Sequence, residues 1–389
     1  MSNLLEARLG ASATDRDTHR PVILRADDPA DRAALEELLK LENRITVHDQ
    51  LDAQLRELVR TMHPAVQWQG DELGQAVRSY LGGRPTMDYG NWVYYPWSFN
   101  LVHLLGEAEF ARLRTDRNRN KITSEEQSTL ATKRVGVIGL SVGQSVSLAL
   151  ALERSFGELR LADFDSLDLS NLNRIRSGVH ELGLNKAIVA ARAIAEIDPY
   201  LVVKVFTEGI TEGNLESFLT KGGNLDVLVE ECDDAVIKIK ARLRAKALRI
   251  PVVMDTSDRG MIDVERFDLE PQRPIMHGML SKLDLSLIDS PMTREEKTAY
   301  IMAMVNPAGL SERMKMSIPE IGRSLMTWPQ LGGHVMLGGS VTAEVVRRIA
   351  LGEMTWSGRW YIDLESLLME RRSVPRTDGS EVVIAPAEA

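Results

Sequence analysis

Hydrophobic positions in the first third of the chain recur mainly with helical periodicity. Between Asp28 and Met62 the apolar side chains recur at helical spacing, and "Asp-Pro" at 28–29 followed by acidic residues is a typical helix start. The aromatic stretch "YGNWVYYPW", Tyr89 to Trp97, predicts a strand closed by Pro96. These aromatics are explained either by the core of a small α+β unit or by the wall of a substrate site.

The pattern changes after Lys133, where short apolar runs alternate with helical segments. We predict strands at 134–138, 158–162, 202–206, 225–230 and 251–255, and helices at 145–155, 185–196, 214–219 and 235–247. Such alternation is typical of parallel strands joined by crossover helices. The segment therefore predicts a doubly wound, Rossmann-like sheet with helices on both faces.

These patterns divide the chain into five parts. We expect a flexible terminus over 1–20, an α+β recognition domain over 21–112, a basic linker and helix over 113–132, and the doubly wound core over 133–268. A C-terminal extension over 269–389 follows, in which "LGGHVMLGGSVTAEVVRRIALG" indicates a glycine-flanked helix returning to the core. The predicted fold class is thus α/β, with a mostly parallel sheet, an N-terminal α+β domain and a C-terminal helical extension.

Composition and charge exclude several classes of function. The 389 residues are 44% hydrophobic and 26% charged with a net charge of −9, which argues against a general nucleic-acid binder. A single cysteine, Cys232, allows neither a disulfide framework nor a four-cysteine structural zinc site. The longest apolar runs are too short to span a bilayer, and residues 1–20 lack the apolar region of a secretory signal. We therefore expect a cytoplasmic protein that binds neither membranes nor nucleic acid.

The stretch "RVGVIGLSVGQSV", Arg134 to Val146, resembles a phosphate-binding strand–turn–helix. The dinucleotide fingerprint requires G-x-G-x-x-G, but here Ser141 follows Gly139 at the second glycine position and the last glycine lies at Gly143. A helix that begins after a strand binds anions through its free N–H groups and its dipole. Alone, this turn fits a nicotinamide site, another nucleotide site or a simple tight turn.

Polar residues after the second and fourth predicted strands favour a triphosphate. Asp163 ends the second strand, where an acid can bind a ribose. Asn171, Arg174 and Lys186 follow, and two cations with an amide suit a triphosphate better than a pyrophosphate bridge. Asp233 lies at the end of the fourth strand, where a carboxylate can hold Mg²⁺. Taken singly, Asp165 and Asp234 are explained by ordinary roles such as helix capping.

The order and spacing of these residues resemble the ThiF-like ATP-dependent adenylyltransferases that activate ubiquitin-like proteins. These include bacterial enzymes of molybdopterin and thiamine biosynthesis and the ubiquitin-activating enzymes. "DFDSLDLSNLNR" is the most specific piece, and the resemblance covers 134–255. It implies that Gly139, Ser141 and Gly143 form the phosphate turn and that Asp163 binds the ribose. It further implies that Asn171, Arg174 and Lys186 hold the triphosphate, and that Asp233 holds Mg²⁺.

The resemblance implies a reaction and an assembly. A substrate carboxylate would attack the α-phosphorus of Mg-ATP, giving an acyl-adenylate and pyrophosphate. Arg117 or Arg119 resembles an arginine that reaches the partner's ATP across a homodimer, and the large N-terminal segment would recognise a small carrier protein or peptide. The glycines missing at 141 and 142 depart from the family, and Cys232, directly before Asp233, argues against a thioester relay.

Two other functions stay open at this point. A non-catalytic nucleotide-binding module would explain the altered glycine turn. A nicotinamide- or flavin-dependent oxidoreductase would explain Gly139 and Asp163, but it would leave Asn171, Arg174, Lys186 and Asp233 without a role. Neither His277 nor His334 belongs to a recognisable catalytic arrangement.

Overall fold

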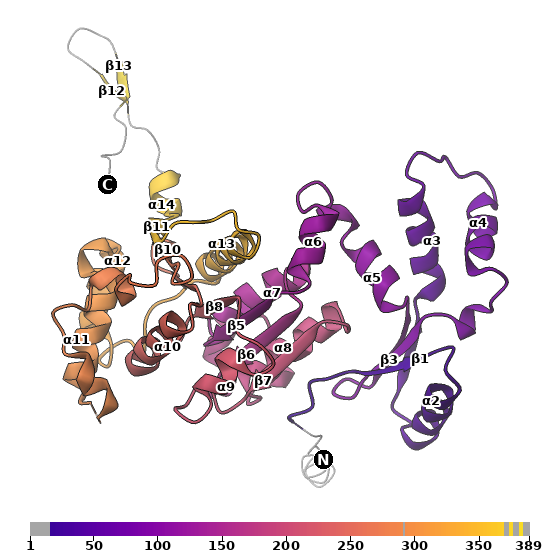
Figure 1. Cartoon of the computed structure of the whole chain (residues 1–389), viewed down its shortest axis with the longest axis horizontal. Coiled ribbons are helices and arrows are strands. Elements are labelled where there is room, and N and C mark those ends of the chain that lie inside the picture. The colour runs from indigo at the N-terminus through magenta and orange to yellow at the C-terminus, as the bar shows by residue number, and fades with distance from the viewer. Residues whose placement is uncertain (1–15, 291, 369–372, 376–380, 384–389) are drawn as a thin grey trace.

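The computed structural model describes residues 16–290, 292–368, 373–375 and 381–383. An N-terminal unit, a central sheet domain and C-terminal helices follow one another along the long axis of the molecule (Figure 1). Most of the expected flexible terminus, residues 1–15, lies outside the described residues.

The N-terminal unit is a four-stranded sheet with helices on both faces. Its strands β1 (Val22–Arg25), β2 (Thr46–Asp49), β3 (Asn91–Tyr95) and β4 (Asn100–Leu104) lie in the order β1-β3-β4-β2. Helix α2 (Pro29–Leu41) covers one face, whereas α3 (Leu51–Met62), α4 (Glu72–Leu81) and α5 (Glu107–Arg114) form a separate cluster. The helical pattern from Asp28 to Met62 corresponds to α2 and α3, but β2 lies between them, pairs parallel to β4 and was not predicted. The aromatic strand and the cap at Asp28 are confirmed.

A short segment joins this unit to the core. It contains the 3₁₀ turn η2 (Asp116–Asn118) and helix α6 (Ser124–Leu130), which begins with a capping box at Thr123. Arg114 donates to Asp198 at 3.0 Å and to the carbonyls of Leu152 and Ala151. Because Asp198 is fully buried, this ion pair fixes the N-terminal unit firmly to the core.

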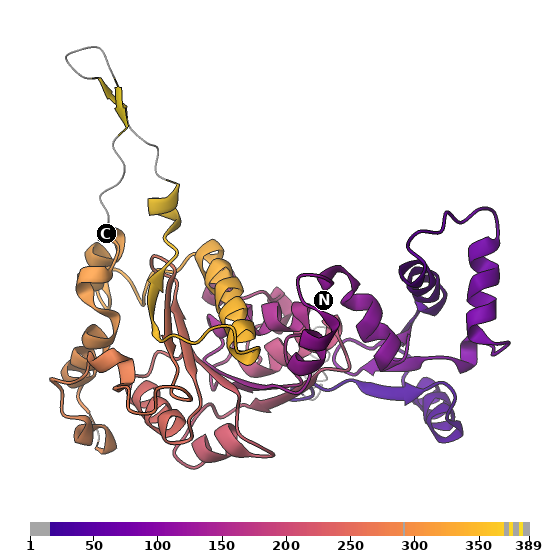
Figure 2. The same cartoon turned by 45° about the horizontal axis from the view of Figure 1, so that its top comes forward.

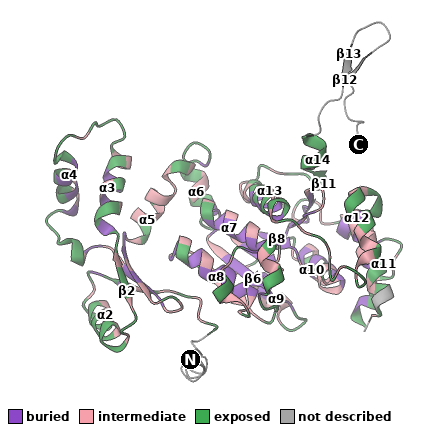
Figure 3. Cartoon of the chain, turned by 180° about the vertical axis from the view of Figure 1, so that it is seen from behind, coloured by how far each residue is buried: buried purple, intermediate pink, exposed green. Residues whose placement is uncertain are grey.

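The central domain confirms the predicted doubly wound sheet. Five parallel strands, β5 (Arg134–Ile138), β6 (Glu158–Ala162), β7 (Val202–Phe206), β8 (Val227–Glu230) and β9 (Val252–Thr256), lie in the order β9-β8-β5-β6-β7. Helices α7 (Gly143–Glu153) and α8 (Lys186–Ile197) cover one face, and α9 (Leu215–Thr220) and α10 (Ala235–Ala247) cover the other. Figure 3 shows the buried residues gathered in this sheet and on the helix faces that pack against it. The strand order reverses at β5 and β8, which opens a crevice at their carboxyl ends.

Two antiparallel strands that the sequence pattern did not reveal extend this sheet. β10 (Met261–Glu265) pairs with β9, and β11 (Gly358–Tyr361) pairs with β10. The C-terminal extension also contains α11 (Arg294–Val305), α12 (Glu312–Ser317), α13 (Gly332–Ala350) and α14 (Leu364–Leu367), followed by the pair β12 (Ser373–Pro375) and β13 (Glu381–Val383).

The predicted glycine-flanked helix is α13, which packs on α7 (Figures 1 and 2). A side chain at Gly339 would lie 2.5 Å from the Cβ atom of Ser145, so glycine permits the close approach of these two helices. Within the described residues, helices of the length and apolarity needed to cross a membrane are absent.

Candidate functional site

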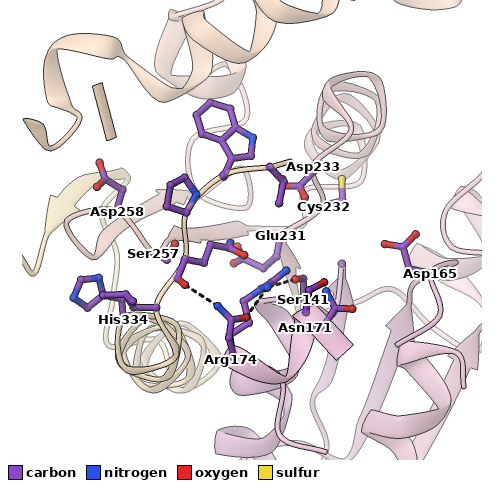
Figure 4. A pocket seen from close by; sticks show the side chains of 18 of the residues that line it. Ser141, Asp165, Asn171, Arg174, Glu231, Cys232, Asp233, Ser257, Asp258 and His334 are labelled. Atoms are coloured by element: carbon purple, nitrogen blue, oxygen red, sulfur yellow. Dashed lines mark hydrogen bonds between the residues drawn. The ribbon is translucent and has the colours of Figure 1, made fainter. Parts of the chain in front are cut away.

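A cavity of about 880 Å³ occupies the carboxyl-terminal edge of the sheet. It lies at the strand-order reversal, where doubly wound sheets bind ligands. Loops after β5, β6 and β8 form one side of it, and the C-terminal extension forms the other (Figure 4). Seven of the sequence-predicted residues line it together: Gly139, Ser141, Asp163, Asn171, Arg174, Lys186 and Asp233.

Gly139 is required by the geometry of the turn between β5 and α7. Its φ is +86°, and a Cβ atom there would lie 2.7 Å from the backbone nitrogen of Cys232. Any other residue would therefore strain the backbone and collide with the loop after β8. Residues 141 and 142 have no such positive φ, so the glycines absent from these positions are not needed for this turn.

Ser141 instead contributes a side chain to the site. Its hydroxyl accepts a hydrogen bond from Arg174 Nε at 3.0 Å, while Arg174 Nη1 donates to Asn173 Oδ1 at 2.8 Å. Burial lowers the pKa of the Arg174 guanidinium from its usual value, and attraction to Asp233 opposes this shift. The departure from the glycine fingerprint thus helps to fix a cation beside the turn.

Asp163 connects the two phosphate-side loops. One carboxylate oxygen accepts the backbone N–H of Leu140 at 2.7 Å, and the other accepts that of Asp165 at 2.8 Å. Burial raises the pKa of Asp163, and these hydrogen bonds act in the opposite direction. Because each carboxylate oxygen has more than one acceptor site, Asp163 keeps the capacity to bind ribose hydroxyls.

Lys186 is almost fully buried at the start of α8 and donates from Nζ to Asp165 Oδ2 at 2.7 Å. Asp165 is therefore not a helix cap but the partner that orients this lysine inside the cavity. Asn171 lies in the 3₁₀ segment η3 (Leu169–Asn173), where its Oδ1 accepts the backbone N–H of Asp168 at 3.0 Å. Its amide nitrogen has no hydrogen-bond partner among the described residues and can donate to a ligand.

The loop after β8 contains two neighbouring aspartates, Asp233 and Asp234, that have different roles. Asp234 is the N-cap of α10 and accepts the backbone N–H groups of Val236 and Ile237, as its structural interpretation predicts. Asp233 is exposed to the cavity, and no hydrogen bond or ion pair engages its carboxylate in the described part of the chain. Burial raises the pKa of the Cys232 thiol well above its usual value, which makes that thiol a poor nucleophile.

A buried acidic pair below the turn was missed by the sequence analysis. Glu231 lines the cavity, and its Oε1 accepts the backbone N–H of Asp255 at 2.9 Å. Neither carboxylate oxygen of Asp255 has a hydrogen-bond partner among the described residues, and burial raises its pKa to about 7. Gly338 makes room for this side chain, since a Cβ atom there would overlap Asp255 Oδ2. The position of Glu231 at a strand tip was the only available signal.

The C-terminal extension forms the far wall, which no sequence pattern indicated. Asp258, in the turn after β9, accepts the backbone N–H of Ser311 at 2.9 Å and also its hydroxyl. Arg259 in the same turn donates to Asp363 at 2.9 Å. The wall also includes Arg313, His334 and the segment 326–331. These contacts close one side of the cavity.

Three predicted residues lie outside the cavity. Gly143 is buried at the first position of α7, where a Cβ atom would lie 2.6 Å from Val137 Cγ1, so its observed role is close packing of helix and strand. Arg117 and Arg119 lie on or directly after η2 and do not line the cavity of their own chain. Arg119 is exposed and pairs with Asp116 at 3.2 Å. His277 also lies elsewhere, with Nε2 3.0 Å from Asp263 Oδ2.

The fold and the cavity define a doubly wound α/β protein with a large cavity at the reversal of its strand order, and comparison with known proteins names the family. Residues 115–305 match the family model described as the ThiF family. A molybdopterin-synthase adenylyltransferase of Haemophilus influenzae is 27% identical over 150 residues, 38% of this chain and 59% of that protein. The chain belongs, through this segment, to the ThiF family.

Other relatives extend the similarity beyond this segment. An uncharacterized protein of Mycobacterium tuberculosis (strain CDC 1551 / Oshkosh) is 47% identical over 277 residues, 71% of this chain. The chain spans only 38% of that relative's length. The crystal structure of the E. coli tRNA N6-threonylcarbamoyladenosine dehydratase in complex with ATP shares 18% identity and covers 62% of this chain and 95% of its own, with a TM-score of 0.45. A TM-score of this size supports no conclusion about function.

Proposed function

We propose that this chain binds Mg-ATP in the 880 Å³ cavity and activates a carboxylate as an acyl-adenylate, releasing pyrophosphate. The observation that carries the proposal is the arrangement of charge around the turn at Gly139. Arg174 and Lys186 provide fixed cations, while Asp233 provides a carboxylate without a partner among the described residues. A nicotinamide site would leave both cations and this acid without a role.

The residues present fit a magnesium site in which the protein supplies a single carboxylate. No group of three or more histidine, cysteine, aspartate or glutamate side chains with metal-binding geometry occurs in the described part of the chain. A single free carboxylate at Asp233 nevertheless suits Mg²⁺, which commonly binds through one or two carboxylates, substrate phosphates and water. Bound there, the ion would neutralise phosphate charge and orient the reacting groups.

In this reaction the protein mainly positions the reactants and stabilises the charge that develops in the transition state. An oxygen of the substrate carboxylate forms a bond to the α-phosphorus of ATP, the bond from that phosphorus to the bridging oxygen breaks, and pyrophosphate takes the electron pair. Asp163 holds the ribose, and Asn171 binds phosphate oxygens through its amide nitrogen. Arg174 and Lys186 stabilise the charge that develops on the phosphates. Because Ser141 and Asp165 already hold these two cations, little reorganisation accompanies the step.

The acyl substrate is proposed to be the carboxyl terminus of a small carrier protein or peptide. The wall segment 326–331 supports this choice. No hydrogen bond engages the backbone N–H groups of Met326, Thr327 and Trp328 in the described structure, and the residue before Pro329 favours an extended conformation. Such a segment can pair with an extended peptide through backbone hydrogen bonds.

ATP–pyrophosphate exchange tests the proposal directly. We expect exchange that depends on Mg²⁺ and on a carboxylate substrate, screened over carrier proteins, peptides and small acids. Asp233→Asn should lower the exchange rate at least about 100-fold, because an aligned charge of this kind contributes several kcal/mol to the transition state. The matched control is Asp27→Asn, which changes an exposed aspartate of the N-terminal unit and should leave exchange unaltered.

Thermal unfolding with different nucleotides distinguishes the proposed adenylyltransferase from a non-catalytic nucleotide-binding module and from a nicotinamide-dependent enzyme. Mg-ATP at about a hundred times its dissociation constant should stabilise the chain by about 2.7 kcal/mol, whereas NADH should not. Stabilisation by ATP without exchange for any carboxylate would favour the non-catalytic module. Stabilisation by NADH alone would overturn nucleotide activation altogether.

A further inference from the structure

A pair of buried carboxyl groups lies at the floor of the nucleotide cavity, and the proposed adenylyl transfer gives this pair no role. Glu231 follows β8 and lines the cavity (Figure 4), whereas Asp255 lies on the neighbouring strand β9. The two residues are only 8% and 4% exposed. They are in direct contact, because the backbone N–H of Asp255 donates to Glu231 Oε1 at 2.9 Å. Both carboxylate oxygens of Asp255 lack a hydrogen-bond partner in the described part of the chain.

Two cations of α10 lie near this pair, but they already bind other carboxylates. Lys238 attracts both Glu231 and Asp255, yet its Nζ donates to Glu230 Oε2 at 2.9 Å. Arg242 forms ion pairs with Glu230 and Glu265. A buried charge that lacks a partner of its own takes up a proton or coordinates a metal ion. The Glu231–Asp255 pair therefore has the charge of a cation site.

Thr342 on α13 brings a third unpaired oxygen to the same place. Its side chain is fully buried, and its Oγ1 has no hydrogen-bond partner among the described residues. A hydroxyl within a helix can bond the carbonyl four residues earlier, as Ser340 does with Met336 at 3.0 Å, but Thr342 makes no such bond. Gly338 lies one turn before Thr342 and against Asp255 Oδ2. Because helical side chains lean toward the N-terminus of the helix, Thr342 leans toward Asp255.

The chemistry of these oxygens indicates the kind of ion. Carboxylate and hydroxyl oxygens suit hard cations such as Mg²⁺, Ca²⁺ and Mn²⁺. Two carboxylates balance a divalent ion, whereas a monovalent ion would leave one negative charge uncompensated. Mg²⁺ commonly binds through one or two carboxylates and keeps several water molecules. Glu231 borders the cavity, so water can reach the ion and complete its coordination.

We propose that Glu231, Asp255 and Thr342 bind a divalent cation of the Mg²⁺ class beneath the nucleotide cavity, distinct from the ion proposed at Asp233. The ion would connect the loop after β8, strand β9 and helix α13. It would also support the turn at Gly139, where a Cβ atom would lie 2.8 Å from the carbonyl carbon of Glu231. The site needs no nucleotide, so the inference does not depend on the proposed adenylyl transfer.

Binding of Mn²⁺ in the absence of nucleotide tests the proposal, because Mn²⁺ takes the same oxygen ligands and its free form is measured by electron paramagnetic resonance. The metal-free, full-length chain is titrated at constant ionic strength and at pH 8. This pH lies above the pKa of about 7 that burial gives Asp255, so a proton does not compete with the ion. We expect about one Mn²⁺ per chain with a Kd below about 1 mM, and Mg²⁺ should displace it.

Variants locate the ion. Asp255→Asn keeps the shape of the side chain but removes its charge, and it should weaken Mn²⁺ binding at least about tenfold. Thr342→Val removes only the hydroxyl and should weaken binding about threefold. Asp233→Asn, in the proposed nucleotide site, should retain this binding, as should Asp27→Asn at an exposed position. Circular dichroism checks that each variant is folded.

Three results would overturn the proposal. They are an unaltered affinity in Asp255→Asn or in Thr342→Val, a loss of binding in Asp233→Asn, and a Kd above about 10 mM in the wild type. None of them bears on ATP–pyrophosphate exchange, which tests adenylyl transfer separately.

Discussion

At the scale of single residues, the nucleotide cavity holds its cations through partners and leaves its outer carboxylate free. Arg174 is held by Ser141, and Lys186 by Asp165, at 3.0 and 2.7 Å. Asp233 has no comparable contact in the described chain. Under the proposed function, such an arrangement would be preorganised for an anionic ligand that brings a metal ion with it, because the protein would supply only one of the ion's ligands.

Asp255 gives a prediction at the same scale. Burial raises the pKa of its carboxyl from 3.8 to about 7. Between these pH values the folded chain holds a proton that the unfolded chain has released, so the free energy of unfolding falls as the pH rises. Asp255→Asn removes the contribution of this carboxyl, whereas Glu231 beside it, whose pKa burial also raises, keeps its own. We expect the variant to gain stability relative to the wild type over this range, by at most about 1.4 kcal/mol per pH unit.

Urea unfolding of both proteins at several pH values measures this effect. The advantage of Asp255→Asn should grow from the acid end of the range and level off above about pH 7. Asp27→Asn, in an exposed position, serves as control and should run parallel to the wild type. Parallel curves for Asp255→Asn as well would mean that the buried carboxyl does not hold the proton.

At the scale of elements, the strand–turn–helix from β5 to α7 departs from the dinucleotide fingerprint without losing its shape. Gly139 alone adopts the left-handed conformation, and it lies against the backbone at Cys232. The next residues follow ordinary backbone geometry, so a side chain at position 141 costs nothing sterically. That freedom allows Ser141 to bind Arg174 from within the turn itself.

Ser141→Gly tests whether this contact matters. The substitution restores the glycine of the fingerprint but removes the acceptor of Arg174 Nε and makes the turn more flexible. We therefore expect ATP affinity, measured by isothermal titration calorimetry, to fall about three- to tenfold, in line with about 1 kcal/mol for one such hydrogen bond. Ser141→Ala removes the acceptor without adding flexibility and should account for most of the loss. Tighter ATP binding in Ser141→Gly would contradict the role assigned to Ser141.

At the scale of the whole molecule, Arg117 and Arg119 lie on the segment that joins the N-terminal unit to the core, and neither lines the nucleotide cavity of the same chain. The Arg114–Asp198 ion pair, 3.0 Å long and buried on the aspartate side, fixes this segment to the core. We therefore propose that an arginine of this segment acts on the cavity of another chain. Self-complementary two-fold interfaces are the commonest form of such an assembly. A homodimer with each site completed in trans thus stays our hypothesis.

Mixing two inactive variants tests the hypothesis. One carries Asp233→Asn, and the other carries Arg117→Ala with Arg119→Ala. After reversible dissociation, random pairing of equal amounts makes about half of the dimers mixed, and one of the two sites in each mixed dimer is intact. Pyrophosphate exchange should therefore return to about a quarter of the wild-type rate. Mixed dimers without activity would show that the arginines act in cis or not at all.

The sequence by itself determined the alternating core, because buried parallel strands and their crossover helices leave strong local patterns. The strands at 134–138, 158–162 and 202–206 and the helix at 235–247 agree with the structure at both ends. The cluster of Gly139, Asp163, Arg174 and Asp233 was also predictable, since parallel strands bring their carboxyl ends to one edge. The sequence pattern did not predict the short strands β2, β10 and β11. Each has only 4 or 5 residues and shows no distinct alternation of apolar and polar side chains.

Only the tertiary structure decided which residues meet across long separations in the chain. The pairing of Asp258 with Ser311, the position of Gly338 beside Asp255 and the hydrogen bond from Asp255 to Glu231 join segments that share no local pattern. The role of Ser141 also depends on tertiary structure, because its hydroxyl accepts a hydrogen bond from Arg174, which lies 33 residues further along the chain. Local periodicity reports which face of an element is buried, but it does not report what the buried face touches.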